Sequence, residues 1–163
     1  MSQFVRGIGP AVAMGFSVMV GLPAMAQTVA TTPDIALPEQ CEFSKPAQLI
    51  TSLSDLPEVA AEFDRLRIDI ADSGEPFVPY DFEDEASRGL PHRQFLRAYV
   101  FTDQIVVWYY HGGFGTHVHV VDLRKVTSAS EPNGSLMALA NLTGPPCVAT
   151  QALLNGVQDL SEW

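Results

Sequence analysis

The sequence predicts one α+β domain: an antiparallel β-meander of at least three strands packed against one long amphipathic helix, with short C-terminal helices and one disulfide. Three observations lead to this prediction. Apolar residues recur at helical spacing after Pro57, three β-rich segments follow one another between residues 94 and 124, and two cysteines lie far apart in the chain, Cys41 and Cys147. The domain is expected to span residues 41–163.

The predicted long helix begins near Pro57 and ends before Gly74. Asp55 is suited to cap it, Pro57 to occupy its first turn, and Glu58 to complete a capping box. The apolar positions that define its buried face are Leu56, Val59, Ala60, Phe63, Leu66 and Ile70.

Three segments rich in β-branched and aromatic residues are predicted to be strands: Gln94–Phe101, Gln104–His111 and Thr116–Arg124. The short connections at residues 102–103 and 112–115 make consecutive strands antiparallel neighbours. Further along the chain, Ser135–Leu142 and Cys147–Leu154 are expected to form short helices, the second beginning at a pair of prolines.

The two turns also predict which side chains share a face of the sheet. A two-residue turn pairs Phe101 with Gln104, and a four-residue glycine loop pairs His111 with Thr116. One face is then purely aliphatic, with Leu96, Ala98, Val100, Ile105, Val107, Val118 and Val120. The other carries Phe95 and the candidate ligand or partner residues Arg97, Tyr99, Trp108, Tyr110, His117 and His119. Exposure of this aromatic face makes it a binding surface; the alternative is that a second layer covers it.

A metal site is a further hypothesis for the same strand. His117 and His119 are two residues apart, so they present two imidazoles on one face, and imidazole is a ligand for zinc and copper. The predicted pairing turns His111 to the aliphatic side; a shift of one residue in the glycine loop is needed to add it as a third ligand. The favoured expectation is no cofactor, with zinc or copper as the alternative.

The first 26 residues predict export. They contain one charged residue, Arg6, then an apolar stretch that ends in Ala24-Met25-Ala26, a small-x-small pattern for signal peptidase. Residues 1–26 are therefore interpreted as a signal peptide and residues 27–40 as a flexible leader. No later segment is long and apolar enough to predict a membrane span. In the periplasm or outside the cell, Cys41 and Cys147 are expected to form a disulfide.

Charge narrows the classes of partner. The 163-residue chain has 19 acidic and 9 basic side chains and a net charge of −10, which argues against nucleic acid as a partner and is compatible with a basic protein or a cell-envelope component. The favoured function is a non-enzymatic binding or accessory protein that uses the aromatic and histidine face. Two alternatives stay open: a metal-binding domain at His117 and His119, and a small-ligand-binding or hydrolytic domain with a pocket near Arg97 and Tyr99.

Overall fold

The structure of the protein is a computed structural model that describes residues 29–80, 85–127 and 134–160. The predicted signal peptide, residues 1–26 with Ala24 and Ala26, lies outside the described residues. Within the three described ranges, no helix is long and apolar enough to cross a membrane.

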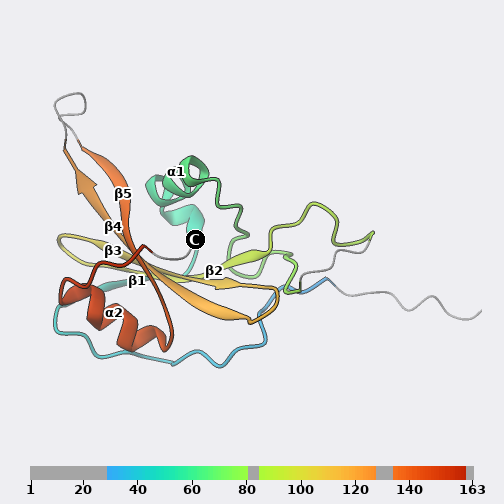
Figure 1. The fold of residues 1–163 in the computed structure, drawn as a ribbon, viewed down its shortest axis with the longest axis horizontal. Coiled ribbons are helices and arrows are strands. Elements are labelled where there is room, and N and C mark those ends of the chain that lie inside the picture. The colour runs from blue at the N-terminus through green and yellow to red at the C-terminus, as the bar shows by residue number, and fades with distance from the viewer. Residues whose placement is uncertain (1–28, 81–84, 128–133, 161–163) are drawn as a thin grey trace, which may run out of the picture.

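One antiparallel sheet of five strands forms the centre of the fold, and its strands follow one another in chain order (Figure 1). They are β1 (Gln48–Ile50), β2 (Arg93–Val100), β3 (Ile105–His111), β4 (His117–Val126) and β5 (Ser135–Thr143). The predicted three-stranded meander is therefore confirmed as β2-β3-β4, and each edge carries one additional strand.

Strand β5 corrects the prediction of a short helix at residues 135–142. This segment contains Leu, Met and Ala, which favour helices when only local propensity acts. In the folded chain its backbone instead pairs with β4 from Ser135 to Thr143, with a bulge between Asp122 and Leu123. Pairing along a whole strand outweighs the small per-residue differences in helix propensity.

Two helices flank the sheet, and both are short. Helix α1 (Pro57–Leu66) begins at Pro57 as predicted, but its N-cap is Leu56 and no side chain caps it, so the predicted capping by Asp55 and Glu58 is wrong. It is only 10 residues long, so the prediction of one long helix is also wrong. It ends because Arg67 adopts a left-handed backbone conformation, with φ of 60°, in which its N–H bonds back to the carbonyls of Phe63 and Asp64. Helix α2 (Pro146–Leu154) begins at the predicted prolines and has 9 residues.

Each helix covers a different face of the sheet (Figure 1). Val59 and Phe63 of α1 pack on one face, in a cluster with Phe95, Val107 and Tyr109 among others. A buried acid also ties α1 to this side of the sheet: Glu62 accepts hydrogen bonds from Arg65 Nε (2.6 Å) and from the backbone N–H of Ala138 (2.8 Å). The sheet is therefore the middle layer of a three-layer arrangement.

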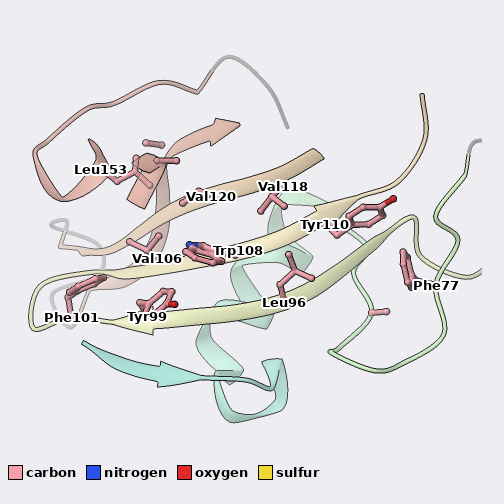
Figure 2. Close-up of a cluster of buried hydrophobic side chains, with 13 residues drawn as sticks. Phe77, Leu96, Tyr99, Phe101, Val106, Trp108, Tyr110, Val118, Val120 and Leu153 are labelled. Carbon is pink, nitrogen blue, oxygen red and sulfur yellow. The ribbon is translucent and has the colours of Figure 1, made fainter. Parts of the chain in front are cut away.

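The opposite face is the aromatic one, and it is a second core (Figure 2). Helix α2 contributes Ala149 and Leu153 to it. The N-terminal segment contributes Ala30, Ile35, Leu37, Cys41 and Phe43 as partly buried members. Three residues of the segment that was expected to be a leader, Ala30, Ile35 and Leu37, thus pack against this core.

The predicted disulfide between Cys41 and Cys147 is confirmed, with a Cα–Cα distance of 5.6 Å. It joins the N-terminal segment to the first turn of α2. Because these are the two parts of the chain that cover the aromatic face, the disulfide holds the covering layer together.

Candidate functional site: a cluster of three histidines

The position of the histidines follows from the strand register. The predicted pairing of Phe101 with Gln104 is confirmed, since Phe101 N–H donates to Gln104 O at 2.9 Å. The glycine loop, however, has five residues rather than four, so that His111 pairs with His117 and not with Thr116. This difference of one residue turns both His117 and His119 to the same face of the sheet as His111.

The three imidazoles converge at the loop end of the β3–β4 hairpin. We call His111, His117 and His119 the histidine cluster; one nitrogen from each lies within 4.8 Å of the others. His117 Nε2 is 2.9 Å from His119 Nε2, and His111 Nδ1 is 3.3 Å from the same His119 nitrogen. His119 is 1% exposed, whereas the other two are half-buried at the rim.

Neighbouring acceptors fix the tautomers of two of these rings. His117 Nδ1 is bonded to the backbone carbonyl of Gly115, and His119 Nδ1 lies 2.9 Å from Asn141 Oδ1. Both oxygens can only accept, so each Nδ1 carries the hydrogen and each neutral Nε2 has a lone pair. With both rings neutral, two lone pairs face each other across 2.9 Å, and a cation between them, a proton or a metal ion, would stabilise this contact.

The surroundings keep His119 neutral and hold its ring in place. Burial lowers the pKa of His119 to about 4, and the charges of the other two histidines and Arg93 act in the same direction against the Asn141 hydrogen bond. Its ring also stacks on Tyr109, with centroids 4.7 Å apart and planes 9° from parallel. A neutral, oriented imidazole is the form that ligates a metal.

Two of the three nitrogen separations in the cluster fit a transition-metal ion, and the third is within 4.8 Å. Metal–nitrogen bonds of about 2.0–2.1 Å, meeting at about 90–110°, separate two ligand nitrogens by roughly 2.9–3.4 Å. The two measured separations, 2.9 and 3.3 Å, lie in that range. Hydrogen bonds from the second ring nitrogen to a carbonyl or amide oxygen, as at His117 and His119, are also usual for metal-bound histidine.

The aromatic residues predicted to share this site lie on the other face of the sheet. Trp108 is fully buried, Tyr110 is 3% exposed and Tyr99 is 7% exposed, so the expectation of an exposed aromatic ligand face is wrong. Trp108 donates from Nε1 to Thr150 Oγ1 of α2 at 2.8 Å. Arg97 lies over the Trp108 ring, 5.3 Å from its centroid, and forms a cation–π pair with it.

Arg97 and Tyr99, the two residues near which a pocket is predicted, both contact the N-terminal segment. Arg97 Nη1 donates to Pro38 O at 3.2 Å, and Tyr99 packs edge-on against Phe43 with centroids 4.8 Å apart. Both are thus engaged with the N-terminal segment, as the alternative of a covering layer anticipated.

Sequence reasoning missed two supporting residues of the histidine cluster, Asn141 and Arg93. Asn141 was assigned to a helix, so its place beside His119 on the neighbouring strand could not be seen. Arg93 pairs directly with His111, but the bulge at Leu96 lies between it and the turn from which the register was counted. No local sequence signal marks that bulge.

No protein-family model matches this chain, and no curated protein or solved structure matches it. Function is therefore inferred from the geometry of the histidine cluster.

Proposed function

We propose that this protein binds a transition-metal ion, zinc or copper, through His111, His117 and His119. One observation carries the proposal. The Nε2 atoms of His117 and His119 lie 2.9 Å apart while the Nδ1 atom of each ring bonds to an oxygen acceptor, and His111 Nδ1 is 3.3 Å from His119 Nε2. Neutral imidazoles suit both metals.

The number of ligands bears on what the metal could do. Among the described residues, the group that could hold a metal contains the three histidines and no acidic or thiol ligand. Sites with three protein ligands keep a position for water or an exogenous ligand, whereas structural zinc sites are closed by four. At such a position a bound metal acts as a Lewis acid. Because His111 and His117 are half-buried at the rim of the cluster, we expect the open coordination position of the metal to face solvent.

Metal content and affinity test the proposal. Purified protein is stripped with a chelator, and binding of Zn²⁺ and Cu²⁺ is measured by calorimetry together with metal content by mass spectrometry. We expect one ion per chain in the wild type and loss of binding in His117→Ala. The matched control is His92→Ala, which removes an imidazole that bonds through Nδ1 to Tyr80 O and is outside the cluster.

His117→Ala is preferred over His119→Ala because His117 is half-buried at the end of a strand, while His119 is part of the core. Circular dichroism of each variant establishes that it is folded. Wild-type protein that binds neither metal, or folded His117→Ala protein that binds as tightly as His92→Ala, would contradict the proposal.

We further propose that the protein is exported and works in the periplasm or outside the cell. The disulfide is compatible with this location. So is the finding that no helix among the described residues could span a membrane. N-terminal sequencing of the protein recovered from cell fractions tests it. A mature chain that begins at Gln27 in the exported fraction is expected; an intact Met1 terminus in the cytoplasm would contradict the proposal. The prediction of a basic or cell-envelope partner stays a prediction.

A further inference from the structure

An arginine, Arg93, lies beside the histidine cluster and belongs to none of the ion pairs within residues 29–80, 85–127 and 134–160. Arg93 is directly opposite His111 in the β2–β3 ladder, and His111 is directly opposite His117 in the next ladder. The three side chains therefore form one row across the same face of the sheet, with neighbouring Cβ atoms about 4.5–5.5 Å apart. His119 and Tyr109 form the adjacent row.

No acidic partner of Arg93 is found among the residues that the structure describes. The ion pairs among the described residues use Lys45, Arg65, Arg124 and Lys125, and none of them includes Arg93. Arg93 Nε is also buried and has no hydrogen-bond partner. Arg93 as a whole is half-buried. Because burying a guanidinium nitrogen without a partner is unfavourable, an acceptor supplied by a ligand would stabilise this side chain.

The charge of Arg93 is felt inside the cluster. It is one of the influences, after burial, that lower the pKa of His119. Burial raises the pKa of Tyr109, against which the charge of Arg93 and a side-chain hydrogen bond from it act. A fixed positive charge next to a bound cation is repulsive unless an anion lies between them. An anion that ligates the metal at its open position and accepts from the guanidinium would neutralise both.

We propose that Arg93 and the metal held by the histidine cluster together bind a small carboxylate, with one carboxylate oxygen on the metal and the other accepting from the Arg93 guanidinium. The planar fork of arginine matches a carboxylate, and such charge-assisted hydrogen bonds are stronger than neutral ones. This inference rests on the proposed metal site. It names the class of ligand for the coordination position that three histidines leave open.

Cobalt provides the test, because the visible absorption of Co²⁺ reports changes in its ligands. Protein loaded with Co²⁺ is titrated with acetate as the probe, in the wild type, Arg93→Met and the control Arg97→Met. Arg97 is on the same strand, but its side chain is on the opposite face, over Trp108. We expect acetate to change the spectrum of the wild type and of Arg97→Met with similar affinity, and to bind Arg93→Met about 10- to 100-fold more weakly.

The outcomes separate the two proposals. Wild-type protein that takes up none of Co²⁺, Zn²⁺ and Cu²⁺ overturns the metal site and the carboxylate site with it. Co²⁺ that binds normally, with acetate affinity equal in wild type and Arg93→Met, overturns only the carboxylate site. Arg93→Met must retain Co²⁺ affinity equal to or above that of the wild type, since it removes a like charge; a large loss of Co²⁺ would assign Arg93 a structural role and also refute the inference.

Discussion

Replacement of Asn141 by leucine is expected to weaken metal binding while leaving the fold intact. Asn141 Oδ1 accepts a hydrogen bond from His119 Nδ1 at 2.9 Å, and both residues are almost fully buried, at 3% and 1% exposure. Leucine has a similar size and no acceptor. When His119 Nε2 binds a metal, its hydrogen must be on Nδ1, where the variant would leave it buried and unpaired.

The magnitude follows from the cost of that unpaired donor. A buried donor without a partner costs about 1–3 kcal/mol, which corresponds to a loss of roughly 5- to 150-fold in affinity. In the metal-free Asn141→Leu variant, the hydrogen of His119 can move to Nε2 and be donated to His117 or His111. The metal-free variant therefore avoids much of this penalty. We therefore expect the weakening to be concentrated in the bound state, within the range of about 10- to 100-fold typical of such supporting residues.

Calorimetric titration of Zn²⁺ into wild type, Asn141→Leu and Asn141→Asp measures the effect. Asn141→Asp keeps an acceptor and adds a charge that favours a bound cation, so its affinity should equal or exceed that of the wild type. Equal affinity in Asn141→Leu and wild type would refute the reasoning, because it would mean that the Asn141 hydrogen bond does not orient His119 for a metal.

Three further predictions concern the fold. Thr150→Val should lower the free energy of unfolding in urea by about 1–3 kcal/mol because it leaves the buried Trp108 N–H unpaired, whereas Thr150→Ser, which keeps the acceptor, should cost about 1 kcal/mol; equal losses would contradict this. Reduction of the Cys41–Cys147 disulfide, which closes a loop with a sequence separation of 106, should lower the same free energy by about 4–5 kcal/mol, and an unchanged urea midpoint would oppose it. Burial raises the pKa of Glu62, but its hydrogen bonds and nearby guanidinium together lower it below its usual value. Its ionised form therefore stabilises the fold above about pH 4.5 and loses this effect as pH falls. The stability difference between wild type and Glu62→Gln should shrink from pH 6 to pH 3, and a constant difference would argue against the assignment.

How far the sequence predicts this fold depends on whether a local signal exists. The helix start at Pro57 and the tight turn between Phe101 and Gln104 are local features, and both were predicted correctly. The end of α1 was not, because Arg67 is not a residue type that marks a left-handed conformation. Strand β5 was missed because its identity depends on pairing with β4, which lies outside its own sequence window.

The histidine cluster shows how a small error in register changes a functional prediction. Strand β3 is apolar or aromatic from Ile105 to Tyr110 and buried on both faces, so its sequence has no alternation to reveal which side chains point to which side. The assignment then depended entirely on the length of the glycine loop. Counting five residues instead of four moves His117 and His119 away from Trp108 and beside His111. Arg97 and Trp108, on the correctly counted side of β3, were paired as predicted.

The three candidate ligands lie within nine consecutive residues of one hairpin, from His111 to His119, while Asn141 and Arg93 reach them from the strands on either side. Capture of the ion and adjustment of its reactivity are thus encoded in separate stretches of the chain. Substitutions in β2 or β5 could retune ligand preference or affinity without dismantling the chelating hairpin.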